Sequence, residues 1–271
     1  GIVDPGRIAS AIQPNTKLIS IIFSNNEIGT INDILSIGQL CKEKDILFHV
    51  DATQAVGKIK FDVSEMNIDF LSFTAHKLYG PKGIGALYIN NNNPKTKLAK
   101  RLFGGSQEGS IKPGTLNVPA IVGFGKAIEI CSQEMAKDYD LTISLRDKFY
   151  KNIVSNLNGV SINGSMKDRL PNNLNFFVDG VRADKLMLEL RDLAFSNSSA
   201  CSSGSTKPSR ILKAIGLTDV QALSSVRFGF GRFNISEEIE YASQRVIDTV
   251  NKLRTFNTNK SLNNKQIVEQ S

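Results

Sequence analysis

The sequence is poor in cysteine and histidine. Its 271 residues include three cysteines, Cys41, Cys131 and Cys201, and two histidines, His49 and His76. Three widely spaced cysteines are too few for a disulfide framework, and their spacing is not that of a zinc site. A reducing, cytoplasmic setting is therefore expected.

Long hydrophobic runs are also absent. No apolar stretch approaches the roughly 20 residues of a membrane-spanning helix. The first ten residues, GIVDPGRIAS, lack the basic start and apolar core of a signal or transit peptide. The 33 basic residues outnumber the 26 acidic ones, but lysines are spread along the whole chain. We therefore expect neither membrane insertion nor direct nucleic-acid binding.

What the sequence does contain is a set of short apolar runs in its first half. Residues 17–23, 46–50, 70–73 and 84–89 predict buried strands, and residues 31–44 have helical periodicity. Asp4 followed by Pro5 predicts the start of a short helix. Continuous apolar strands separated by a helix indicate an α/β fold with a mainly parallel sheet covered on both faces.

The second half has a different pattern. Two helices are predicted at residues 118–136 and 141–157. Short strands at 160–163, 173–178 and 226–230 then alternate with helices at 183–191, 208–215 and 237–254. We expect a large domain over residues 1–135 and a smaller C-terminal α/β domain over residues 136–255. The polar segment 256–271 is expected to be a mobile tail.

Polar side chains gather where the predicted strands end. In parallel sheets, ligands bind beyond the carboxyl ends of the strands. The residues at such ends are Asn25, Asn26, Asp51, Gln54, Thr74, His76 and Lys77. A lysine at this place is unusual, because lysine is rarely buried unless it is paired or used chemically. A desolvated amine is a nucleophile that can form a Schiff base with a carbonyl cofactor.

Pyridoxal phosphate is a cofactor that needs such a lysine. It also needs an acid that keeps its ring nitrogen protonated, so that the ring can act as an electron sink. Lys77 suits the first role and Asp51 the second. Gln54 can donate to the ring's phenolic oxygen, while Thr74 and His76 can donate to the phosphate.

Each of these residues also has a plainer interpretation. Asp51 is a common type of helix cap, and Asn26 a common turn residue. Lys77 precedes a Gly-Pro turn, where lysine is usually solvated. His49 lies within a predicted strand and is expected to be a hydrogen-bonded core side chain.

The three cysteines divide into two kinds. Cys41 and Cys131 lie on the apolar faces of predicted helices and are expected in the core. Cys201 lies in a loop of small residues, SNSSACSSGSTKPS. Such a loop can move a thiol between two sites, so Cys201 is a candidate nucleophile, although it can equally be incidental.

Several motifs together carry a resemblance to a known family. They are SNNEIG (24–29), HVDATQAVGK (49–58), SFTAHKLYGPKGIGALY (72–88), and SSACSSGS (198–205) followed by PS-x-x-L-x-A-I-G. Over residues 1–254 the chain resembles class V, fold-type I pyridoxal phosphate enzymes, specifically the NifS/IscS-type (group I) cysteine desulfurases. Family members are longer at the N-terminus, so the chain resembles a member that lacks its N-terminal part.

The resemblance implies a role for each matching residue. Lys77 binds the cofactor covalently, and Cys201, Lys77 and His76 are the catalytic residues. Arg227 binds the substrate carboxylate, for which a guanidinium is suited, with Asn26 beside it. Thr115 reaches the phosphate in a partner subunit, so a homodimer is implied. The cofactor-binding residues are Lys77, Asn26, Asp51, Gln54, Thr74, His76 and Thr115.

The activity that the resemblance implies is removal of sulfur from L-cysteine, giving L-alanine and a persulfide on Cys201. The sulfur then passes to an iron–sulfur scaffold or a tRNA-thiolation protein, and Cys201 is a candidate transient iron–sulfur ligand. Two alternatives remain: a selenocysteine lyase or another class V enzyme such as an aminotransferase, and a non-catalytic chain that binds sulfur-transfer partners. An aminotransferase has no need of a loop thiol.

Overall fold

The computed structural model describes residues 1–197 and 207–268, with side chains described up to residue 256. The chain divides into two compact units. The first, here the N-terminal unit, comprises Ile2–Asn25 and Ile31–Lys137, and the second, here the C-terminal unit, comprises Gly1, Asn26–Thr30 and the chain from Asp138 on. The short segment Asn26–Thr30 thus belongs to the C-terminal unit. From the sequence we expected it in the large domain, with the rest of residues 1–135.

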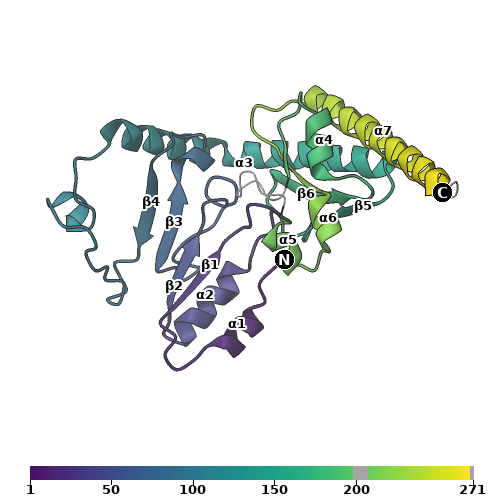
Figure 1. Ribbon diagram of the computed structural model, residues 1–271. Helices are drawn as coiled ribbons and strands as arrows, with labels where there is room; N and C mark the ends of the chain where they lie inside the picture. The colour runs from purple at the N-terminus through teal and green to yellow at the C-terminus, as the bar shows by residue number, and fades with distance from the viewer. Residues whose placement is uncertain (198–206, 269–271) are drawn as a thin grey trace. The chain divides into compact units, whose positions relative to one another are not determined.

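The N-terminal unit is built on a four-stranded sheet in the order β1-β2-β3-β4 (Figure 1). Strands β1 (Leu18–Ile22), β2 (Leu47–Asp51) and β3 (Phe70–Thr74) are parallel, and β4 (Gly85–Ile89) is an antiparallel edge. Helix α2 (Ile34–Glu43) packs beside β2 and against α1 (Pro5–Ala11). The prediction of a mainly parallel α/β sheet is confirmed.

Local sequence explains these elements. The side chain of Asp4 accepts from the Gly6 N–H, and Pro5 takes the first helical position of α1, as predicted. Asp33 caps α2 by accepting from the Ser36 N–H at 3.0 Å. On β2, Phe48 and Val50 are fully buried, and burial of such a side chain contributes about 1.5–3 kcal/mol. Burial of these side chains stabilises β2, the strand that ends at Asp51.

The C-terminal unit has an antiparallel sheet in the order β5-β6-β8-β7. Its strands are β5 (Val160–Ile162), β6 (Asn173–Val178), β7 (Ser196–Asn197) and β8 (Ser225–Gly229). Its core centres on Phe149, whose ring centroid lies 4.7 Å from that of Phe228 and 5.8 Å from that of Phe230. The helices are α3 (Val118–Asn156), shared by both units, α4 (Ala183–Glu189), α5 (Arg210–Ala214), α6 (Asp219–Leu223) and α7 (Ser236–Val268).

Three helical details differ from the expectations. Residues 118–156 form one continuous helix rather than two, because neither glycine nor proline interrupts residues 137–141. Helix α6 was not predicted, although its Thr218–Gln221 capping box is readable in the sequence. Helix α7 continues to Val268, over most of the segment for which we expected a mobile tail.

Candidate active site

The carboxyl edge of the parallel sheet brings together the first group of predicted residues. Asp51 is the last residue of β2 and Thr74 the last of β3, and these strands are paired with Asp51 opposite Ser72. Lys77 ends the 3₁₀ turn η1 (Ala75–Lys77), which follows β3 directly. A carboxylate, a hydroxyl and an amine therefore lie at one edge of the sheet, as the sequence predicted.

Asp51 has a local hydrogen bond of its own. It is half-buried, and its Oδ1 accepts from the N–H of Thr53 at 3.0 Å. This bond satisfies one carboxylate oxygen and fixes the direction of the other. The cap-like interpretation is thus partly correct, and it is compatible with a ligand role for the same side chain.

Thr74 and His76 form a short hydrogen-bonded chain. The Thr74 hydroxyl donates to the carbonyl of Ile84 at 3.0 Å and lies 3.0 Å from Nδ1 of His76. Because a hydroxyl has a single proton, this pattern assigns the proton between the two side chains to Nδ1 of His76. His76 is exposed. The pair therefore offers polar groups at the end of β3, where the sequence predicted phosphate binding.

The exposure of the Lys77 side chain differs from the expectation. We expected a desolvated amine, but Lys77 is exposed in this chain. A lysine with a more desolvated amine is half-buried Lys58, whose Nζ donates to the main-chain carbonyl of Lys77 at 3.3 Å. Burial, reinforced by the charge of Lys77, lowers the pKa of Lys58 to about 8. Sequence reasoning missed Lys58, although it is the last residue of the motif HVDATQAVGK.

Lys58 can be tested by competitive labelling with trace acetic anhydride. We expect its acylation to follow a pKa of about 8, roughly two units below that of an ordinary lysine. The Lys77→Ala variant should raise this midpoint, because the charge of Lys77 opposes protonation of Lys58. Peptide mapping would report both values, with exposed Lys44 as the internal reference. A midpoint equal to that of Lys44 would contradict the burial of Lys58.

Two further predicted cofactor residues lie in loops of the N-terminal unit. Gln54 is half-buried in the turn after β2. Thr115 is exposed between the 3₁₀ turn η2 (Gln107–Ser110) and α3. Among the described contacts, neither makes a hydrogen bond to Asp51 or Lys77. Their proposed roles therefore rest on the sequence alone.

Asn26 and Arg227 are brought together within the C-terminal unit. Arg227 lies on β8, and its guanidinium donates to the main-chain carbonyl of Asn26 at 2.9 Å. The residues are 201 positions apart in the chain. Cys201, the predicted nucleophile and transient cluster ligand, lies outside the described residues. Within the part of the chain that the structure describes, no group of histidine, cysteine or acidic side chains could hold a metal ion.

The two remaining cysteines are buried as the sequence predicted, whereas His49 is hydrogen-bonded as predicted but half-buried rather than in the core. His49 is hydrogen-bonded within the sheet, to Ser20 at 2.8 Å and to Ser72 at 3.2 Å. Cys41 and Cys131 are buried. Burial, with the nearby Asp69 carboxylate, raises the pKa of the Cys41 thiol to about 11. A thiol that keeps its proton is a poor nucleophile, so Cys41 is structural.

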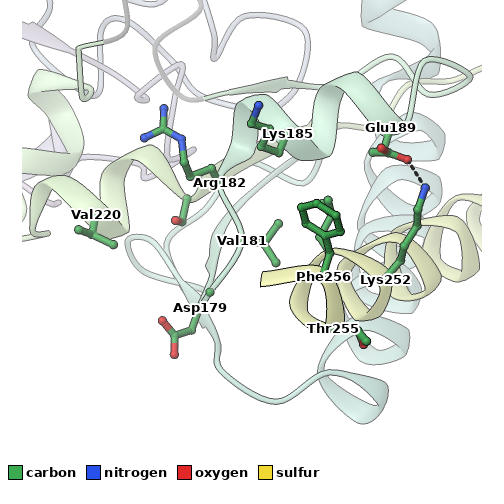
Figure 2. A pocket seen from close by; sticks show the side chains of 12 residues that line it. Asp179, Val181, Arg182, Lys185, Glu189, Val220, Lys252, Thr255 and Phe256 are labelled. Carbon is green, nitrogen blue, oxygen red and sulfur yellow. Dashed lines mark hydrogen bonds and ion pairs between the residues drawn. The ribbon is translucent and has the colours of Figure 1, made fainter. Parts of the chain in front are cut away.

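A pocket of about 1010 Å³ lies in the C-terminal unit. Figure 2 shows side chains from α4 and α7 around it, with an ion pair between Lys252 and Glu189 at 2.6 Å. None of the predicted site residues lines this pocket.

Comparison with known proteins decides the family. The aminotransferase class-V family matches residues 1–242 of the chain. The chain belongs to the aminotransferase class-V family. Enzymes of this family use pyridoxal phosphate, so the predicted cofactor is confirmed. No helix of the described residues is both long and apolar enough to cross a membrane.

Individual relatives of this class V chain are similar along most of its length. Cysteine desulfurase IscS of Stutzerimonas stutzeri is 47% identical over 94% of the chain. A solved NifS-like protein is 30% identical over 92% of the chain, with a TM-score of 0.82. SspA, solved in complex with cysteine, is 33% identical over 86% of it, with a TM-score of 0.70. The chain spans 62%, 65% and 64% of these three proteins, respectively.

Proposed function

We propose that this chain carries the catalytic residues of a pyridoxal phosphate-dependent cysteine desulfurase. The observation that supports this most is the sheet edge formed by Asp51, Thr74 and Lys77. The similarity to cysteine desulfurase IscS over 94% of the chain, and to a structure of SspA with cysteine, supports L-cysteine as the substrate. The product is L-alanine, and the sulfur remains on Cys201 as a persulfide.

The side chains at the edge fit pyridoxal phosphate chemically. The amine of Lys77 would bind the aldehyde carbon, and the carboxylate of Asp51 would pair with the ring nitrogen. Gln54 would donate to the phenolic oxygen. For Thr74 and His76 to donate to the phosphate, the Thr74 proton would turn away from the Ile84 carbonyl and the His76 Nδ1 proton away from Thr74. Thr115 would serve the partner subunit of a homodimer. When bound, the cofactor supplies an electron sink.

The other residues act on the substrate and its sulfur. Arg227 binds the substrate carboxylate, with Asn26 next to it, and the Lys77 amine takes and returns the α-proton. The Cys201 thiolate attacks the substrate sulfur. A sulfur–sulfur bond forms as the carbon–sulfur bond breaks, and the electron pair of that bond stays with the carbon product, which is protonated to alanine. The sulfur then passes, in the cytoplasm, to an iron–sulfur scaffold or a tRNA-thiolation protein.

The activity test uses the purified chain with pyridoxal phosphate and L-cysteine. We expect a visible absorbance band that shifts on addition of cysteine, and alanine and sulfide in equal amounts when a thiol reductant is present. L-Serine, which has a carboxylate and an amine but no sulfur, is the matched control. A band that shifts without formation of alanine would favour another class V reaction, while absence of any band would favour a non-catalytic chain.

A further inference from the structure

The segment Asn26–Thr30 is bound by the C-terminal unit through its main chain. The carbonyl of Glu27 accepts from the side-chain amides of Asn175 at 3.0 Å and Asn173 at 3.4 Å. The Gly29 carbonyl accepts from the N–H of Leu170 at 2.9 Å. Asn175 is fully buried, and its hydrogen bond to Glu27 helps to compensate the desolvation of its amide. These contacts fix the position of Glu27.

The side chain of Glu27 is hydrogen-bonded to the N-cap residue of helix α5. Its Oε2 accepts from the hydroxyl of Ser209 at 2.5 Å. Ser209 is itself the N-cap of α5 and accepts from the N–H of Leu212 at 3.2 Å. Burial raises the pKa of the Glu27 carboxyl, whereas the Ser209 hydrogen bond and the charge of Arg227 act in the opposite direction. A hydrogen bond that reaches across 182 positions thus ties α5 to Glu27.

Arg227 is attached to the same segment. Its guanidinium donates to the carbonyl of Asn26, the residue before Glu27, and feels the Glu27 charge. A guanidinium has five N–H donors in a rigid fork, so anchoring one of them sets the direction of the others. A substrate carboxylate that binds two parallel donors is sensitive to that direction.

We propose that Glu27 is a positioning residue that holds the Arg227 guanidinium and the start of α5 in one fixed arrangement. This inference deepens the proposed function and rests on it, because it concerns the arginine that binds the cysteine carboxylate. Glu27 touches neither cofactor nor reacting atoms in this proposal. It acts through Arg227 and through Ser209.

Steady-state kinetics of the enzyme loaded with pyridoxal phosphate give the first test. We expect Glu27→Ala to raise KM for L-cysteine about tenfold, the effect of losing one charge-assisted hydrogen bond, with a much smaller change in kcat. Glu27→Gln keeps an acceptor oxygen for Ser209 but removes the charge that acts on Arg227, so its KM should lie between those of the wild type and Glu27→Ala. Ser209→Ala should raise KM for L-cysteine by less than Glu27→Ala does. Combined with Glu27→Ala, it should add little, because both changes remove the same bond.

A second measurement does not depend on activity. Phenylglyoxal modifies arginine side chains, and peptide mapping gives the rate at Arg227, with Arg182 as a remote reference. We expect severalfold faster modification of Arg227 in Glu27→Ala, and intermediate rates in Ser209→Ala, which loses the hydrogen bond, and in Glu27→Gln, which loses the charge. A variant that merely loses stability would have a lower melting temperature without this pattern.

The kinetic and modification measurements together distinguish failure of the cysteine desulfurase proposal from failure of the positioning role of Glu27. If the wild-type chain does not desulfurate cysteine but Glu27→Ala exposes Arg227 to modification, the cysteine desulfurase proposal fails and the positioning role stands. If the wild-type chain is active and both KM and the Arg227 rate are unchanged in Glu27→Ala and Ser209→Ala, the positioning role is overturned.

Discussion

Replacing Lys77 with alanine should remove the visible absorbance of bound pyridoxal phosphate and the release of sulfide from cysteine. The amine at the end of η1 is the group expected to bond the cofactor aldehyde, and the same amine moves the α-proton. Loss of such an acid–base group alone lowers a rate by about 100-fold or more. An absorbance spectrum and a sulfide assay on the purified variant measure both effects.

Two neighbouring lysines provide controls for Lys77→Ala. Lys82 is exposed between η1 and β4, and Lys82→Ala should retain the absorbance band. Lys58 is the stricter control, because its amine has a lowered pKa and contacts the Lys77 main chain. If Lys77→Ala keeps the band and Lys58→Ala loses it, the covalent role belongs to Lys58.

Replacing Cys201 with serine should abolish the enzyme persulfide while leaving the cofactor absorbance intact. Serine keeps the size of the side chain, but its hydroxyl is not ionised near neutral pH and does not accept the substrate sulfur. Mass spectrometry of the protein after incubation with L-cysteine should find one added sulfur atom on the wild-type chain and none on the variant.

The buried cysteines are the matched controls for this second prediction. Cys41 and Cys131 are both buried in the N-terminal unit, and burial raises the pKa of the Cys41 thiol. Cys131→Ala should therefore leave persulfide formation unchanged. Equal sulfide release from the wild-type chain and Cys201→Ser would remove Cys201 from the mechanism.

The positions of Asp51, Thr74 and Lys77 were predictable because parallel strands place their carboxyl ends at one edge. Each follows an apolar run that is visible in the sequence. The roles of Asn26 and Arg227 came instead from resemblance, since no periodicity connects residues 201 positions apart. Their contact within the C-terminal unit could be seen only in the structure.

Other features escaped prediction for identifiable reasons. Lys58 looks like an ordinary surface lysine until burial and the carbonyl of Lys77 are known. Glu27 looks like a loop residue until Ser209 is found beside it. In both cases the decisive partner lies elsewhere in the chain, and residue type alone favours the solvated interpretation.

The inclusion of Asn26–Thr30 in the C-terminal unit has a consequence for the order in which the chain folds. A polypeptide that starts at Asp138 lacks the acceptor of the Asn175 amide and the partner of Ser209. Each hydrogen bond of this kind contributes about 0.5–1.5 kcal/mol to stability. During synthesis, a segment made early must therefore wait for strands made more than a hundred residues later. Such long-range closure slows folding, and the C-terminal unit reaches its full set of hydrogen bonds only in a chain that contains both parts.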